Sequence, residues 1–112
     1  MMLVSTMDHV PGKKVVRVLG LVRGNTIRAR HLGQDIMAGL RTLVGGEVKE
    51  YTKMLAEARE EALDRMLAAA RQLGANAVLE VRLASAQVIG GAAEIVAYGT
   101  AVVLEDDPTA TG

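Results

Sequence analysis

The pattern of apolar positions predicts several short strands and two helices. Residues 14–23 carry valine and leucine on both faces, which is typical of a strand covered on both sides. Regular alternation would place Val18 and Val22 on a common face of this strand. Gly24-Asn25 predicts a turn, so residues 26–30 are expected to return as a short second strand paired in a hairpin with the first.

One long segment has the spacing of an amphipathic helix. Between residues 51 and 73, apolar side chains recur every three or four positions, and charged residues occupy much of the remaining surface. Glu61 and Arg65 stand in the favourable i,i+4 order, and Gly74 follows where a left-handed C-terminal residue is required. Similar spacing predicts a second, shorter helix over residues 31–44.

Two further strands follow the long helix. Residues 77–83 alternate apolar with polar side chains, so Leu79 and Val81 are expected on one face. Residues 94–104 are apolar on both faces, and Gly90-Gly91 between the two segments favours an antiparallel hairpin. Because one long helix covers only one side of such a sheet, the second side needs another cover. The short helix over residues 31–44 could supply part of it, and the simplest remaining cover is a second copy of the chain.

Composition narrows the class of protein. Half of the 112 residues are apolar, cysteine, phenylalanine and tryptophan are absent, and thirteen basic residues balance thirteen acidic ones. This length suits a single α+β domain. A net charge of zero disfavours nucleic-acid binding, and the absence of cysteine excludes disulfides and thiolate ligands. With no signal peptide and no membrane-spanning apolar run, we expect a cytoplasmic protein that binds no membrane.

Several short segments carry a family resemblance through their order and spacing. They are Ser5-Thr6, Leu19-Gly20-Leu21-Val22, Gly24-Asn25, Val44-Gly45-Gly46-Glu47, Tyr51-Thr52, Glu57-Ala58-Arg59, Leu73-Gly74-Ala75-Asn76-Ala77-Val78 and Tyr98-Gly99-Thr100-Ala101-Val102. In these segments the chain resembles the YbjQ family, whose members are described as heavy-metal-binding and are largely uncharacterised.

The resemblance implies a fold and an assembly. The subunit would be a dodecin-like β-α-β-β unit, with a small antiparallel sheet packed on one long helix. Residues 1–105 would form a single YbjQ-like domain, and residues 106–112 an acidic, flexible tail. The family also implies a ring-forming homo-oligomer of about five subunits, a pentamer or a decamer of two stacked rings.

Metal binding was tested against the residues that could act as ligands. The chain has two histidines, His9 and His31, which are far apart and belong to no paired helical motif. The nearby Asp8 and Asp35 are residues common on protein surfaces. A turn or surface role is therefore favoured for both histidines, and a metal site would require a ring to gather one histidine from each subunit.

Gly45-Gly46 precedes a predicted helix, where unpaired amide groups could hold an anion. No Lys-Ser or Lys-Thr pair follows as in a P-loop, and Glu47 and Glu50 would repel a phosphate. A turn that lets two elements pack closely is the favoured interpretation.

No combination of residues predicts catalysis. The hydroxyl groups considered have no histidine nearby in the sequence, the two strand glutamates are expected to pair with Arg82 or solvent, and the tyrosines are expected to pack. These residues are Ser5, Thr6, Ser85 and Thr100, Glu80 and Glu94, and Tyr51 and Tyr98.

Three classes of function follow. The favoured class is a homo-oligomeric binding or scaffold protein that holds any small ligand in clefts between subunits. The alternatives are a metal-ion-binding protein with ring-multiplied ligands and, less favoured, an enzyme with a composite intersubunit site. The sequence assigns no catalytic, cofactor-binding or metal-ligating residue, and it does not identify a cofactor, a ligand or a biological process.

Overall fold

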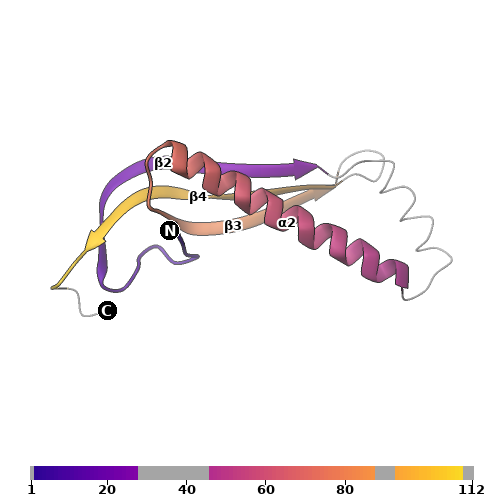
Figure 1. Ribbon diagram of the computed structural model, residues 1–112, viewed down its shortest axis with the longest axis horizontal. Coiled ribbons are helices and arrows are strands. Elements are labelled where there is room, and N and C mark those ends of the chain that lie inside the picture. The colour runs from indigo at the N-terminus through magenta and orange to yellow at the C-terminus, as the bar shows by residue number, and fades with distance from the viewer. Residues whose placement is uncertain (1, 28–45, 88–92, 110–112) are drawn as a thin grey trace.

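One long helix lies across one face of a small sheet (Figure 1). The computed structural model describes residues 2–27, 46–87 and 93–109. Its elements, in chain order, are β1 (Leu3–Val4), β2 (Lys13–Ile27), α2 (Gly46–Gln72), β3 (Ala77–Gln87) and β4 (Ala93–Asp106). The strands form a four-stranded sheet in the order β1-β3-β4-β2, so β2 is an edge strand. The α+β class and the single long helix are as expected within the described residues.

The helix α2 begins five residues before the predicted start and ends at Gln72, two residues before Gly74. Gly74 has a φ of +86°. Its amide donates to the carbonyl oxygen of Arg71 at 3.0 Å, and the Ala75 amide donates to that of Ala70 at 3.1 Å. This pair of bonds is a Schellman motif, which satisfies carbonyl groups at the helix end. The predicted C-terminal role of Gly74 is therefore confirmed.

The predicted turn at Gly24-Asn25 is wrong. Strand β2 continues through both residues to Ile27 and pairs with β4 along its length. A Cβ atom at Gly24 would overlap the carbonyl oxygen of Ala62 and the amide nitrogen of Met66, so the glycine is required where β2 and α2 touch. Residues 28–30 of the predicted return strand, the predicted helix over 31–44 and Gly90-Gly91 lie outside the described residues.

A short N-terminal strand adds to the sheet. Strand β1 runs parallel to β3, with Leu3 opposite Ala77, so the sheet is mixed and not purely antiparallel as expected. The amide of Leu3 donates to the carbonyl oxygen of Asn76, and the amide of Ser5 to that of Val78. Sequence patterning missed β1 because two residues carry no detectable periodicity.

Two apolar clusters lie on opposite faces of the sheet. The face under α2 holds the larger cluster, where the small side chains of Ala58 and Ala62 let the helix lie close to the strands. We call the opposite face the far face. There the second cluster, which includes Leu79 and Val102, is covered by Leu3 and Val10 of the N-terminal segment. The chain therefore shields part of the far face itself, which the sequence did not predict.

Irregular pairing changes which side chains share a face. The register of β2 against β4 shifts between Val18 and Gly20. As a result Val18, opposite Val102, lies on the far face, whereas Val22 is buried against α2. The predicted common face for these two valines is wrong because a bulge reverses the alternation.

The last two strands pair as an antiparallel hairpin, as predicted, and both are longer than predicted. At the far end of β4, Asp106 lies opposite Lys13, and the Lys13 Nζ is 2.6 Å from Asp106 Oδ1. The strand pair β2–β4 therefore extends to Asp106, the first residue of the segment 106–112.

Candidate functional site

The far face brings together polar residues from three strands. Arg82 of β3 lies opposite Tyr98 of β4, which in turn lies opposite Arg23 of β2. In the next row, Thr100 lies opposite Leu21. Since directly opposed residues of paired strands project to the same side, all five side chains lie on the far face.

A bulge in β3 shapes this region. Leu79 lies opposite Thr100 and Arg82 lies opposite Tyr98, so Glu80 and Val81 together oppose the single residue Gly99. Glu80 has a φ of 54°, the left-handed region that a residue with a side chain rarely adopts. A Cβ atom at Gly99 would lie 2.7 Å from Cγ1 of Val78, so only glycine fits opposite the bulge.

The bulge also corrects the predicted alternation of β3. Val81 packs in the cluster under α2, whereas Leu79 belongs to the cluster on the far face. In a regular strand with Leu79 on the far face, the side chain of Glu80 would point under the helix. The extra residue instead leaves Glu80 exposed.

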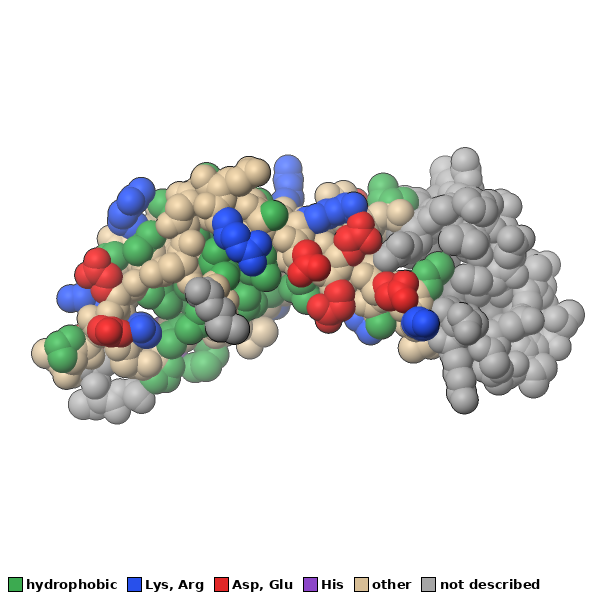
Figure 2. Space-filling view, in the orientation of Figure 1, with side chains coloured by type: hydrophobic (Ala, Val, Ile, Leu, Met, Phe, Trp, Pro, Cys, Tyr) green, Lys and Arg blue, Asp and Glu red, His purple; other side chains and the backbone are tan. Residues whose placement is uncertain are grey.

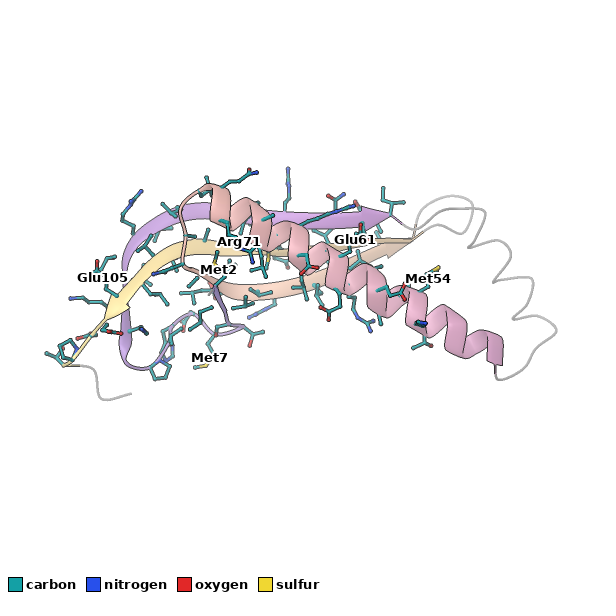
Figure 3. The ribbon with its side chains drawn as sticks, in the orientation of Figure 1. Met2, Met7, Met54, Glu61, Arg71 and Glu105 are labelled. Atoms are coloured by element: carbon teal, nitrogen blue, oxygen red, sulfur yellow. The ribbon has the colours of Figure 1, made fainter. Side chains whose placement is uncertain are left out.

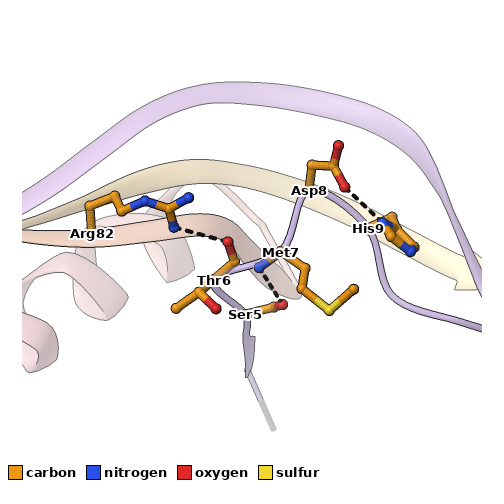
Figure 4. A network of polar contacts seen from close by, with 6 residues as sticks. All are labelled: Ser5, Thr6, Met7, Asp8, His9 and Arg82. Carbon is orange, nitrogen blue, oxygen red and sulfur yellow. Dashed lines mark hydrogen bonds and ion pairs between the residues drawn. The ribbon is translucent and has the colours of Figure 1, made fainter.

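The N-terminal segment is hydrogen-bonded to β3 at the bulge and beside it, and Figure 4 shows the bond between Arg82 and Thr6. The Glu80 amide donates to the carbonyl oxygen of Met7, and the Val81 amide donates to that of Ser5, both at 3.0 Å. A guanidinium nitrogen of Arg82 donates to the carbonyl oxygen of Thr6 at 2.9 Å. These bonds give the amides of Glu80 and Val81 acceptors where the β3–β4 register shifts, and they join Arg82 to the N-terminal segment.

A depression of about 300 Å³ opens beside the bulge. It is lined by Leu21, Glu80, Arg82, Tyr98, Gly99 and Thr100. Among the described residues, the Glu80 carboxylate and the hydroxyl groups of Tyr98 and Thr100 make no hydrogen bond or ion pair. The depression therefore brings together a guanidinium group, a carboxylate, two hydroxyl groups and an apolar side chain. Its carboxylate and hydroxyl groups are available to hydrogen-bond a ligand.

Apolar side chains of the edge strand are exposed in the described part of the chain, and Leu21 among them lines the depression. Val18 is 69% exposed, Leu21 66% and Ile27 61%, all on β2. The edge of β2 that faces away from β4 has no strand partner among the described residues. A long edge strand with apolar side chains is a surface on which another chain can pair.

Within the described residues, the side chain of His9 contacts one other possible metal ligand, its neighbour Asp8. Its Nδ1 lies 2.7 Å from Asp8 Oδ1, and both side chains are exposed. This contact lowers the pKa of Asp8 from its usual value, chiefly through the hydrogen bond from His9. No three histidine, cysteine or carboxylate side chains come together within residues 2–27, 46–87 and 93–109. His31 and Asp35 lie outside those ranges.

The other residues considered from the sequence are separated. The Glu94 carboxylate accepts a hydrogen bond from the side-chain Nδ2 of Asn25 at 3.1 Å. It lies well along the sheet from Glu80, so the two glutamates share no proton. The sequence expected these glutamates to pair with Arg82 or solvent; Glu80 is exposed to solvent, and the bonds of Arg82 go to backbone carbonyl oxygens. Gly45 and the side chain of Tyr51 lie outside the described part of the chain.

Two other depressions lie away from the far face. One of about 500 Å³ is lined by Met2, Leu67, Arg71, Ala75 and Asn76 (Figure 3 shows Met2 beside Arg71). The other, of about 420 Å³, follows the exposed side of α2, where acidic side chains gather (Figure 2). Glu61 of that group bonds to Arg65 at 2.5 Å in the predicted i,i+4 pair, which is typical of a solvated helix face.

Sequence reasoning missed the depression beside the bulge. Each of its polar residues was visible in the sequence, and Tyr98 and Glu80 were considered singly. Their convergence depends on the bulge and on the register of three strands, for which the sequence has only one signal, the glycine at position 99.

Comparison with known proteins agrees with this architecture. A family model described as "YbjQ_1: Putative heavy-metal-binding" matches residues 2–105. A UPF0145 protein of Thermus thermophilus is 65% identical over 103 residues, which cover 92% of this chain and 90% of the relative. A UPF0145 protein of Clostridioides difficile is 59% identical over 106 residues, 95% of each chain. The chain therefore belongs to the YbjQ family, as its sequence segments indicated.

A solved structure shares the fold. It is a crystal structure of a protein of unknown function in the DUF74 family from Pediococcus pentosaceus, with a TM-score of 0.62 and 14% sequence identity. The match covers 93% of this chain and 98% of the other. In the described residues of our chain, no helix has the length and apolar character needed to cross a membrane.

The family's description and the described residues disagree over metal. A heavy-metal site requires several ligands converging on one point. The described part of a single protomer supplies only the exposed pair Asp8 and His9. These residues do not fit a metal centre, and we derive no chemistry through a metal.

Proposed function

We propose that this protein acts as a cytoplasmic homo-oligomeric binding or scaffold protein, in which a second copy covers the exposed part of the far face and pairs with the edge of β2. The observation that carries the proposal is the edge strand β2, which has no strand partner on its outer side within residues 2–27, 46–87 and 93–109 and whose residues Val18, Leu21 and Ile27 are each more than 60% exposed.

Burial of these side chains favours association because apolar area removed from water stabilises a contact by about 25 cal/mol per Å². A net charge of zero removes the long-range repulsion that would oppose contact between identical chains. It also leaves no overall field to attract nucleic acid.

The two edges of the sheet are formed by different strands, β1 with β3 at one edge and β2 at the other. A contact between unlike edges closes into a ring when the rotation between neighbouring copies completes a circle, which is the geometry of the pentamer or stacked decamer that the family resemblance implies.

Mass measurement of the native protein tests the proposal. Light scattering after size-exclusion chromatography, at micromolar concentration, should give a ring of about five copies or twice that number. The double variant Val18→Asp, Leu21→Asp should elute as a folded monomer, because it places charges in the apolar contact.

Leu73→Asp is the matched control. Leu73 is 48% exposed at the end of α2 and lies away from the far face, so this variant should keep the native mass. A monomeric native protein with an intact circular dichroism spectrum, or a double variant that assembles like the native chain, contradicts the proposal.

A further inference from the structure

We infer that the depression beside the β3 bulge binds a small zwitterion of the amino-acid type, an ammonium and a carboxylate on a short apolar body. The site is formed by Glu80, Arg82, Tyr98, Thr100 and Leu21 of one protomer. It lies on the face that we propose a second copy covers, so the inference extends the proposed function by naming the class of ligand.

First, the depression holds two opposite charges that do not pair with each other. Glu80 and Arg82 both line the depression, yet they form no ion pair with one another. One guanidinium nitrogen of Arg82 is committed to the carbonyl oxygens of Thr6 and Val81, each at 2.9 Å. The remaining donors of the guanidinium are available, and their fork geometry suits a carboxylate.

The second step is the conformation of Glu80. Its left-handed backbone is unfavourable for a residue with a side chain, and glycine or asparagine would occupy it more easily. Nothing in the described protomer compensates for this with a bond to the Glu80 carboxylate. Backbone strain of this kind concentrates at binding sites, and a ligand ammonium would give the carboxylate its missing partner.

The third step is the remainder of the lining. Tyr98 offers a ring face and a free hydroxyl, Thr100 offers a second hydroxyl, and Leu21 offers an exposed apolar side chain. A volume of about 300 Å³ is at the small end of ligand sites. The complementary ligand is therefore compact, carries both charges and has an apolar portion that packs on Leu21 and Tyr98.

Calorimetric titration of the full-length protein with free amino acids tests this inference. The probes are leucine and phenylalanine, their N-acetyl derivatives, which lack the ammonium, and their amides, which lack the carboxylate. We expect saturable binding of at least one zwitterion and binding at least about tenfold weaker for both of its derivatives.

Two variants assign the charges. Arg82→Gln should abolish the preference for the free carboxylate over the amide, and Glu80→Gln should abolish the preference for the free ammonium over the N-acetyl form. Glu105→Gln, an exposed glutamate on β4 outside the depression, should bind like the native protein. Circular dichroism melting of each variant checks that it is folded. If Arg82→Gln does not fold, Glu80→Gln still tests the inference, because it removes no hydrogen bond among the described residues of the protomer.

The outcomes separate this inference from the proposed function. An oligomer that binds no amino acid, or whose binding is unchanged in both variants, overturns the inference while the assembly stands. A monomer that binds a zwitterion with both charge preferences supports the inference and overturns the assembly.

Discussion

Gly24 of β2 lies against the backbone of Ala62 in α2, with no room between them for a Cβ atom. On either side of this contact, the Thr26 hydroxyl donates to the carbonyl oxygen of Ala58 at 3.1 Å, and Arg65 donates to that of Asn25 at 2.6 Å. Close backbone approach and two hydrogen bonds thus set the position of the helix on the edge strand.

Gly24→Ala should destabilise the protein because the methyl group forces β2 and α2 apart. Overpacking of this kind lowers the free energy of unfolding by about 1–3 kcal/mol or more. Urea denaturation measures the change. Ala68→Gln, which adds volume at an exposed position of α2, should shift stability by no more than about 0.5 kcal/mol. Equal effects of the two substitutions would contradict the close contact.

Glu80→Gly should not destabilise the protein, although glycine normally weakens a strand. The left-handed backbone costs a residue with a side chain about 1–2 kcal/mol, and glycine removes that cost. We expect the free energy of unfolding to stay constant or to rise by up to about 1 kcal/mol. Glu105→Gly, in the regular part of β4, should lower it by about 0.5–1 kcal/mol. A loss of stability in both variants would show that Glu80 is unstrained.

Asn76→Ala should cost about 1–3 kcal/mol of unfolding free energy. The Asn76 side chain accepts from the Leu104 amide at 2.7 Å and donates to the Leu104 carbonyl oxygen at 2.9 Å, extending the sheet beyond the end of β3. Its removal leaves both backbone groups unpaired. Asn76→Asp keeps only the accepting half, and thermal melts at neutral pH should place it between the native protein and the alanine variant.

The end of the β2–β4 pair should respond to acid. Lys13 lowers the pKa of Asp106 below its usual 3.8, mainly through the hydrogen bond between them. A depressed native pKa means that the carboxylate stabilises the fold above pH 3.8 and that this contribution is lost as the pH falls through the native pKa.

NMR titration of the Asp106 carboxyl checks this prediction. Its pKa should lie below 3.8 in the native protein and move upward in Lys13→Gln. Asp107, whose pKa is lowered chiefly by a hydrogen bond from Thr109, should keep its depressed value in that variant. An Asp106 pKa that does not change in Lys13→Gln would exclude the ion pair in solution.

Much of the candidate site is inaccessible to sequence reasoning for a definable reason. Alternation predicts faces only in a regular strand, and β2 and β3 both contain register shifts. Each shift reverses the face to which the following side chains point. Val18 and Val22 therefore lie on opposite faces of the sheet, and so do Leu79 and Val81. Glu80 and Arg82 therefore line the depression with Tyr98 because of the bulge in β3, which the sequence pattern does not predict.

The amino-acid sequence by itself determined the α+β class, the long helix with Gly74 at its end, the β3–β4 hairpin and the family. These depend on local periodicity and on the left-handed backbone of Gly74 that ends the helix, and both can be recognised from neighbouring residues in the sequence. Only the tertiary structure decided that Gly24 is a contact and not a turn, that the N-terminal segment covers part of the far face, and that Glu80 and Arg82 line a depression with Tyr98. Those features arise from pairings between residues distant in the sequence, whose register depends on the packing of the whole sheet.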